Sequence, residues 1–315
     1  MGKEIFFNGH EISKHEQMGI TQGEVEKAKQ YEIHDAEFDK IKEQIDWNVL
    51  NQLFVEIAQK SGISPKDLNL LGADKILNCQ LFETGWSGDK EIIGRYSATG
   101  NYLAVNSNQI KKSAKEKGVD TKLMILDTVF HELCHSISHH THVINRNYSE
   151  EFFTGKNEIT YTGAYRSSKD INKIKFSQVT DRKSESHNDA LDEAITEKMA
   201  TQIFHEYARK VNLTDKKTMD DYQEKFLGDE NREYNQLVKF IEKLCQIVSE
   251  RTGVDKEVVW NGFVRGSFYK STLGDPEIKQ WFAETFSPTF LTELGHAKKA
   301  EDLFALVKKY ESVHI

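Results

Sequence analysis

Three residues that can bind and use a metal ion lie together in one apolar stretch, as the H-E-x-x-H motif formed by His131, Glu132 and His135. Side chains four residues apart on an α-helix lie on one face about one turn apart, so both histidines can direct an imidazole nitrogen at a single zinc ion. The Glu132 carboxylate stands beside the first histidine, where it can take a proton from a metal-bound water. The motif therefore predicts two zinc ligands and a general base.

The residues around the motif predict the helix that must position it. Apolar side chains recur there at helical spacing, at Leu123, Leu126, Val129, Phe130, Leu133 and Ile137. Such a stripe indicates an amphipathic helix whose apolar face points to a core. Cys134 lies on the apolar side and is expected to be a small core residue rather than a ligand. A histidine pair on an ordinary helix face remains the alternative, so a third ligand has to decide.

An acidic segment further along the chain can supply that ligand. Within 188–197, Glu193 and Glu197 are four residues apart and share one face of a predicted helix, which begins at a cap formed by Ser186 or Asn188. One carboxylate can reach the ion while the other accepts the remaining N–H of a ligating imidazole. An exposed acidic helix face is the alternative. If Glu193 is not a ligand, the search moves to His139, His142 and His187.

The two segments together resemble the gluzincin branch of the zincin metallopeptidases, typified by thermolysin, whose second motif helix carries N-E-A-x-x-D. The resemblance implies that Glu193 is the third zinc ligand and that Glu197 orients His131. Asp192 and Glu197 stand where the family has Asn and Asp. A metzincin would need Gly at 138 and His at 141, where this chain has Ser and Thr. We therefore expect an α+β fold with a zincin-like core, a small mixed sheet plus motif helices, and one Zn²⁺ per chain.

Gluzincins also place a Tyr or His donor opposite the zinc to stabilise the oxyanion formed during amide hydrolysis. Tyr161, Tyr165 and His187 are candidates by location, and we assign Tyr165 and His187 to the predicted catalytic set with Glu132. All three lie in or beside the polar stretch 143–187, which is either a lid over the cleft or a surface insertion. His205 can lie near the ligands, although an ordinary histidine role is expected more often.

Several strands are predicted before the motif helix. Residues 76–82 read as one strand, and 91–96 with 102–106 as a hairpin. In zincins the strand before the motif helix forms the sheet edge along which an extended peptide pairs. Tyr102–Asn106 occupies that place, and an interior strand without a substrate role is the alternative. Short strands are also predicted at Ile159–Tyr165 and Lys173–Val179.

The remaining segments predict helices. A helical period runs from about Glu24 to Lys60 and ends at Ser61-Gly62. From 208 onward the chain reads as helical, with one helix over Tyr234–Val248, another from Val258 to Tyr269, and later starts at Asp275-Pro276 and Ser287-Pro288. The predicted organisation is an N-terminal helical segment over 1–65, a catalytic core over 66–207 with an insertion at 143–187, and a mainly helical C-terminal subdomain over 208–315. In that subdomain Arg265 and Tyr269 can contribute to a cleft wall, although core and surface roles are expected more often.

The composition limits the classes of partner. The 315-residue chain has a net charge of −8, which disfavours nucleic acid and anionic membranes as partners. Its N-terminus has only three consecutive apolar residues, Ile5 to Phe7, too few for a signal-peptide core, and no run approaches a membrane span. Three widely spaced cysteines suit reduced thiols. We expect a cytoplasmic protein, with secretion by a signal-independent route left open.

Together these features predict a soluble zinc metallopeptidase that acts on a peptide or protein substrate. His131, His135 and Glu193 bind Zn²⁺, Glu132 serves as general base, and Glu197 orients His131. Two alternatives belong to other classes: a metal-binding interaction or regulatory module without proteolysis, and a helical interaction protein with a chance motif. A third is an effector protease with a single protein target. The oligomeric state is open.

Overall fold

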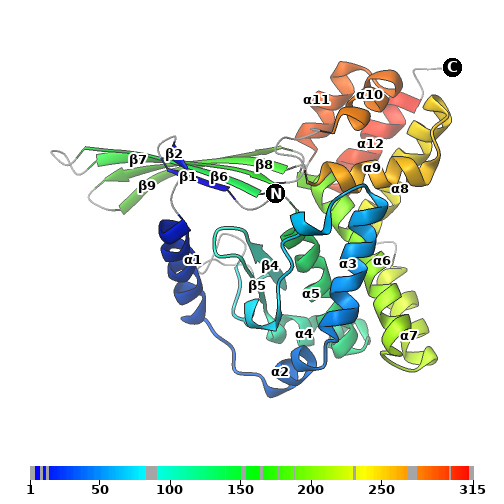
Figure 1. The fold of residues 1–315 in the computed structure, drawn as a ribbon, viewed down its shortest axis with the longest axis horizontal. Helices are drawn as coiled ribbons and strands as arrows, with labels where there is room; N and C mark the ends of the chain where they lie inside the picture. Colours follow the sequence, from blue (N-terminus) through cyan, green and yellow to red (C-terminus); the bar gives the residue numbers. More distant parts are fainter. Residues whose placement is uncertain are drawn as a thin grey trace. The chain divides into compact units, whose positions relative to one another are not determined.

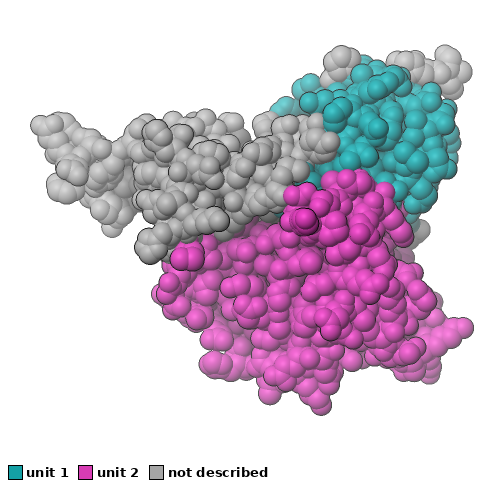
Figure 2. Space-filling view, viewed as in Figure 1, with its two compact units in different colours: residues 1–17, 138–195, 237–315 teal, residues 18–137, 196–236 magenta. Residues whose placement is uncertain are grey.

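The computed structural model describes residues 4–7, 10–11, 14–82, 91–138, 140–149, 154–163, 166–175, 178–187, 189–229, 232–268, 275–297 and 299–311. Within these ranges, only the backbone is described for residues up to 17 and for 19–20, 140–187, 288 and 311. The fold is α+β and mostly helical (Figure 1). The chain divides into two compact units (Figure 2): unit 1 comprises Met1–Gln17, Ser138–Ile195 and Leu237–Ile315, and unit 2 comprises Met18–Ile137 and Thr196–Gln236. Both units are discontinuous in sequence, and the three predicted domain segments stay a prediction.

Unit 2 contains a small mixed sheet in the order β3-β5-β4. β3 (Ile76–Asn78) runs parallel to β5 (Tyr102–Val105), and β4 (Gly94–Ser97) runs antiparallel to β5. The predicted hairpin is thus confirmed. The prediction that Tyr102–Asn106 forms the sheet edge is wrong, because β5 pairs on both sides and has no unpaired edge to offer. The interior alternative holds for β5, and in the described sheet β4 is an edge strand.

Helices make up most of unit 2. Those that lie wholly in it are α2 (Ala36–Glu43), α3 (Trp47–Lys60), α4 (Ser107–Lys117), α5 (Thr121–Ile137), α7 (Lys216–Tyr222) and a π-helix, Gln223–Leu227. Two more, α1 (Lys14–Lys29) and α6 (Asp189–Val211), begin in unit 1 and lie mostly in unit 2. Asp35 and Asp46 cap α2 and α3 by accepting backbone N–H bonds. α3 ends before Gly62, whose φ of 76° suits glycine, so the predicted end of this helical segment is confirmed.

The motif helix α5 lies in the core of unit 2. Almost every residue from Leu123 to Ile137 is buried, including polar members, so the helix is enclosed rather than half exposed. Phe130 packs edge-on against Phe204 and Tyr207 of α6, with ring centroids 6.2 and 5.0 Å apart. The Tyr207 hydroxyl accepts a hydrogen bond of 2.8 Å from the Asp46 N–H, which joins α6 to the start of α3. These contacts fix the spacing of α5 and α6.

Unit 1 contains a six-stranded sheet in the order β2-β1-β6-β7-β8-β9. Its strands are β1 (Glu4–Phe7), β2 (His10–Glu11), β6 (His140–Ser149), β7 (Thr154–Gly163), β8 (Arg166–Lys175) and β9 (Gln178–His187). The two short strands predicted in 143–187 are therefore wrong in extent, and the N-terminal segment is not wholly helical. Sequence pattern hid these strands because polar residues dominate them; β8 has only Ile171 and Ile174 as apolar residues, and their spacing breaks the alternation of a half-buried strand.

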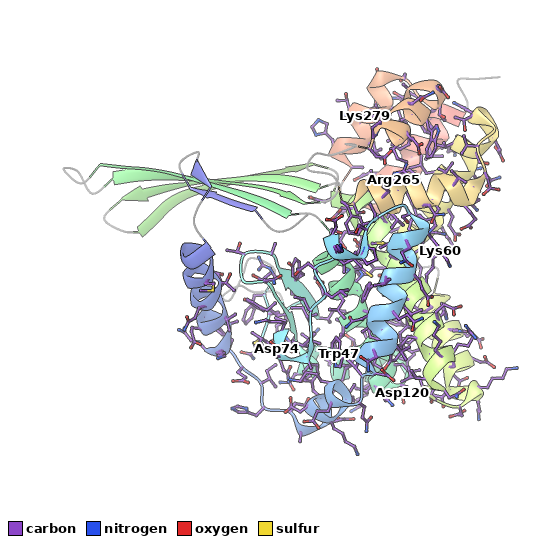
Figure 3. All side chains as sticks on the ribbon, viewed as in Figure 1. Trp47, Lys60, Asp74, Asp120, Arg265 and Lys279 are labelled. Atoms are coloured by element: carbon purple, nitrogen blue, oxygen red, sulfur yellow. The ribbon has the colours of Figure 1, made fainter. Side chains whose placement is uncertain are left out.

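The C-terminal part of the chain is helical in its described residues, as predicted. Its helices are α8 (Glu233–Thr252), α9 (Lys256–Gly266), α10 (Pro276–Thr285), α11 (Pro288–His296) and α12 (Ala300–Glu311). Pro276 and Pro288 occupy the first turns of α10 and α11, which confirms both predicted starts. Arg265 lies on α9 (Figure 3). It pairs with Asp275 and Glu277 at the start of α10. Among the described residues, no helix is long and apolar enough to cross a membrane.

Candidate functional site

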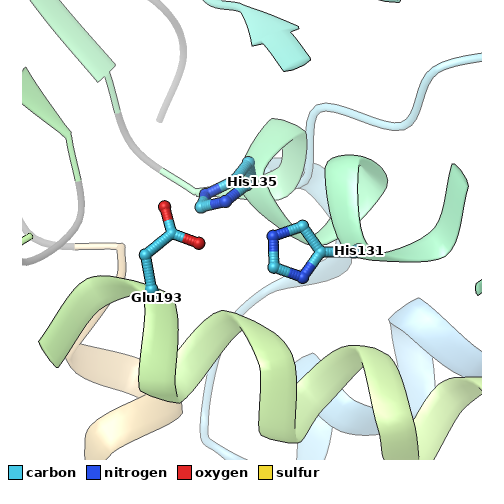
Figure 4. A group of neighbouring side chains, drawn as sticks. All are labelled: His131, His135 and Glu193. Atoms are coloured by element: carbon cyan, nitrogen blue, oxygen red, sulfur yellow. The ribbon is translucent and has the colours of Figure 1, made fainter. Parts of the chain in front are cut away.

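Three side chains with metal-binding atoms meet where α5 and α6 lie against each other. One donor atom each from His131, His135 and Glu193 lies within 4.8 Å of the other two. Figure 4 shows the Glu193 carboxylate directed at the two imidazole rings. His131 is buried, and the other two residues are partly exposed. The three predicted ligands, which come from two distant segments, are thus brought to one place.

Each histidine has a side chain of α6 next to its Nδ1 atom. The Nδ1 of His131 lies 2.8 Å from Oε2 of Glu197, the predicted contact, and the Nδ1 of His135 lies 3.5 Å from Oγ1 of Thr196. The other ring nitrogen, Nε2, is then the one left for an ion in both residues. Sequence analysis did not identify Thr196, although its place beside Glu197 on the same helix was a usable signal.

Glu132 is buried against the backbone of the edge strand β4. A Cβ atom on Gly94 would lie 2.8 Å from Oε1 of Glu132 and 2.8 Å from Cγ2 of Thr128, closer than real Cβ contacts come. Glycine at 94 therefore lets the strand pass directly over the carboxylate of the predicted base. Only the pairing of β4 in three dimensions reveals this contact, and it could not be inferred from the sequence.

A buried ion-pair network lies behind His131. Nη1 of Arg232 is 3.1 Å from Oε1 of Glu197, and Nη2 is 3.5 Å from Oδ2 of Asp127, four residues before His131. Burial raises the pKa of Asp127 to about 6, although the positive charge of Arg232 opposes the rise. Burial alone would lower the pKa of Arg232, and the Glu197 and Asp127 charges raise it. Each charge in this network is thus held in a dry environment by its partners.

Tyr234, in the first turn of α8, lies beside the first histidine. Its ring centroid is 5.3 Å from that of His131, with an interplanar angle of 74°. The guanidinium carbon of Arg232 lies 5.2 Å from the Tyr234 ring centroid and 4.2 Å from that of Phe226, so it stacks between two aromatic rings. Tyr234 is partly exposed. Neither Arg232 nor Tyr234 was identified from the sequence, because no local spacing links them to the motif.

The other predicted site residues have different outcomes. Tyr165, His139 and Tyr269 lie outside the described residues. For Tyr161 in β7, His142 in β6 and His187 at the end of β9, the description covers the backbone only, so their predicted roles stay predictions.

Two further candidates have identified partners. His205 has its Nδ1 3.2 Å from Nε2 of Gln223, and burial lowers the pKa of its ring. Its described contact joins α6 to the π-helix. Arg265 forms the ion pairs with Asp275 and Glu277 in unit 1, which is the structural role expected more often than a part in a cleft wall.

The donor set suits a zinc ion. Two imidazoles and one carboxylate form the His₂Glu set known from catalytic zinc sites, and three protein ligands leave a further position for water or substrate. Glu132, Glu197 and Asp127 are buried carboxylates, whereas Arg232 supplies one positive charge. A divalent cation would balance this excess of buried negative charge.

The site thus combines ligand atoms that can hold a cation, a buried carboxylate next to them, and a tyrosine and an edge strand close by. Such a combination can activate water and polarise a carbonyl group. Comparison of the chain with protein-family models, with curated proteins and with solved structures found no match.

Proposed function

We propose that this chain is a zinc-dependent metallopeptidase with a gluzincin-type zincin core. The observation that carries the proposal is the convergence of His131, His135 and Glu193, with Glu197 hydrogen-bonded to the first histidine. A chance H-E-x-x-H motif gives no reason for a carboxylate from a distant helix to lie beside both rings. A chance motif also gives no reason for a second carboxylate, that of Glu197, to hydrogen-bond to the His131 ring.

Each of the surrounding residues has a task in peptide hydrolysis. A zinc ion bound at the three ligands supplies a Lewis acid that lowers the pKa of water and polarises a carbonyl group. Glu132 accepts the proton of the attacking water and passes it to the leaving amine. Tyr234 joins His187 and Tyr165 as a candidate donor to the developing oxyanion, because its ring contacts a ligand histidine. Glu197 keeps the His131 ring in the orientation that presents Nε2.

A peptide or protein is the substrate class that the sheet favours. β4 is an edge strand in the described sheet and passes over Glu132 at Gly94. An extended backbone can add to such an edge through main-chain hydrogen bonds, which hold the chain regardless of its sequence. The scissile bond would then lie close to the general base.

The test compares the metal content and the peptide cleavage of four purified proteins. Wild type and Glu132→Gln are expected to hold one zinc each, Glu193→Gln to lose it, and only wild type to cleave a peptide library. Glu206→Gln is the control, since Glu206 is an exposed residue of α6 that pairs with Arg209; it should match wild type in zinc content and activity. No stoichiometric zinc in wild type would refute the proposal. Zinc without cleavage of any peptide would favour a metal-binding module or a protease with a single target.

A further inference from the structure

Arg232 is far from the H-E-x-x-H motif in the sequence, but its ion pairs connect it to the proposed metal site. Glu197 divides its two oxygens: Oε2 faces the Nδ1 of His131 at 2.8 Å, and Oε1 faces Nη1 of Arg232 at 3.1 Å. The Glu197 side chain is only 3% exposed, so water cannot replace either partner freely. The orientation of this carboxylate therefore depends on both contacts.

Arginine suits this position better than any other cation. Its planar group bridges Glu197 on α6 and Asp127 on α5, and it stacks between the rings of Phe226 and Tyr234. A guanidinium can donate in two fixed directions within one plane, whereas a lysine ammonium is a single charge on a flexible stem. A guanidinium can therefore contact the carboxylates of both helices at once, which a lysine ammonium would do less precisely.

Arg232 is itself held by the chain around it. Its Nη1 donates a hydrogen bond of 3.1 Å to Oδ1 of Asn235, a buried residue of α8. Nδ2 of Asn235 donates in turn to the carbonyl oxygens of Phe226 and Asp229, at 2.9 and 2.8 Å. Through Asn235, Phe226 of the π-helix and Asp229 are therefore tied to the guanidinium, which in turn contacts Glu197.

We propose that Arg232 is a positioning residue of the metal site: it holds Glu197 so that the carboxylate fixes the His131 ring for metal binding, and it thereby sets the metal affinity. This inference rests on the proposed zinc site. It extends that site from the ligands to a second ion pair and to the start of α8. Arg232 does not touch the ion and acts through Glu197.

A double-mutant cycle on zinc affinity tests this role directly. The dissociation constant is measured by chelator competition for wild type, Arg232→Lys, Glu197→Gln and the double variant, with folding checked by circular dichroism. Arg232→Gln is run in parallel, so that failure of one substitution to fold does not decide the result. Arg209→Gln is the control, since Arg209 is an exposed arginine of α6.

We expect Arg232→Lys to weaken zinc binding by about 10- to 100-fold, the range found for residues that support metal ligands. In the Glu197→Gln background the same substitution should weaken binding by less than about threefold, because the residue through which it acts is already altered. A merely structural arginine would lower thermal stability in both backgrounds and leave the affinity of the folded protein unchanged. An unchanged affinity in Arg232→Lys and Arg232→Gln, or equal losses in both backgrounds, would overturn the role of Arg232 alone. Absence of zinc from wild type would overturn the proposed function as well.

Discussion

At the scale of single residues, Tyr234 lies beside His131, one of the proposed metal ligands. Its ring meets that of His131 at 5.3 Å, it is partly exposed, and Arg232 packs on it. A phenol hydroxyl can donate a hydrogen bond to a developing oxyanion without a change of charge at neutral pH. A catalytic role for Tyr234 therefore requires its hydroxyl, whereas a packing role requires only the ring.

The substitution Tyr234→Phe separates these two roles. We expect kcat to fall by about 10²- to 10³-fold, the range for loss of one oxyanion donor, while zinc content stays at one per chain. Steady-state kinetics with metal analysis measures both quantities. Tyr310→Phe on α12, whose ring packs against Phe290, is the control and should keep its kcat. Full activity in Tyr234→Phe would show that the Tyr234 hydroxyl is not the oxyanion donor and would leave His187 and Tyr165 as candidates.

The site residues that could be predicted from the sequence are those with fixed spacing on one helix. His131, Glu132 and His135 are linked by the helical repeat, and Glu193 and Glu197 are linked in the same way on α6. Arg232 and Gly94 are linked to the motif only through tertiary packing, and nothing in their neighbourhood in the sequence marks them. The residues that the sequence predicts are therefore the proposed ligands, the proposed base and the partner of His131, and the missed residues are those that contact them.

At the scale of elements, β4 is a strand that passes close to Glu132, the predicted base. Its backbone at Gly94 leaves no room for a Cβ atom between the strand and Glu132. The position of the carboxylate thus depends on a strand that belongs to the sheet and not to either motif helix. If Glu132 is the general base, a substitution in β4 can therefore change the reaction rate without changing the three proposed metal ligands.

Gly94→Ala should therefore impair turnover without loss of metal. The added methyl group would meet Glu132 Oε1 and Thr128 Cγ2 at 2.8 Å, so the carboxylate has to move. We expect kcat to fall by at least about tenfold and stability by about 1–3 kcal/mol, the cost of overpacking, with zinc content unchanged. Kinetics, metal analysis and urea unfolding measure the three quantities. Gly23→Ala is the control, because nothing lies within 4 Å of the added atom. Wild-type kcat in Gly94→Ala would show that the base tolerates the displacement.

A second prediction concerns the cap of α2. The Asp35 carboxylate accepts hydrogen bonds from the backbone N–H groups of Glu37 and Phe38 and, at 2.7 Å, from the Ser107 hydroxyl. It also forms an ion pair with Lys111, whose Nζ lies 2.8 Å from Oδ2. Burial alone would raise the pKa of Asp35, but these bonds and the Lys111 charge lower it below its ordinary value. A lowered pKa in the folded state adds stability above about pH 4, and this stability is lost as the pH falls through the folded-state value.

Asp35→Ala should cost about 1–2 kcal/mol at pH 7, the usual loss for an N-cap, measured by urea unfolding. Asp35→Asn keeps a cap but loses the charge, so its deficit relative to wild type should shrink between pH 7 and pH 3. Lys111→Met, which removes the same ion pair from the other side, should show the same narrowing. A deficit in Asp35→Asn that does not change with pH would mean that the charge contributes nothing to stability.

The elements that could be predicted are those with a strong local pattern. α5 has its apolar period, α10 and α11 have proline in the first turn, and the hairpin of β4 and β5 has a turn between two short runs. The order of strands in the sheet could not be predicted in this way, because it depends on which distant strand, here β3, reaches β5. Within β6 to β9, the predicted strands cover only part of β7 and the adjoining ends of β8 and β9, because these strands are mostly polar and give no regular alternation.

At the scale of the whole molecule, three helices, α1, α6 and α8, have residues in both units. α6 contributes its first residues, up to Ile195, to unit 1 and the rest to unit 2, and α8 crosses from unit 2 to unit 1 after Gln236. Glu193 and Glu197 are neighbours on α6 although the division falls between them. A metal ion bound by Glu193 would stabilise the folded form of α6.

Removal of metal should lower the stability of the protein. A ligand that binds only the folded state stabilises it by about 2.7 kcal/mol at a free concentration 100 times its Kd. We expect a chelator to lower the Tm of wild type, and added zinc to restore it. Glu193→Gln should start at the chelated value and respond to neither treatment. Differential scanning calorimetry provides the comparison, and an equal response of wild type and Glu193→Gln would contradict the assigned ligand.

Because all three cysteine thiols are buried, their reactivity can report local opening of the structure without any substitution in the chain. All three are buried and none forms a disulfide: Cys79 directly follows β3, Cys134 lies beside His135 in α5, and Cys245 lies in α8. A thiol reagent reaches such a residue when the surrounding structure opens, so the rate at which each cysteine is labelled reports how often its own region fluctuates. Peptide mapping by mass spectrometry can follow the three rates separately, and a bound metal should slow the rate at Cys134 most.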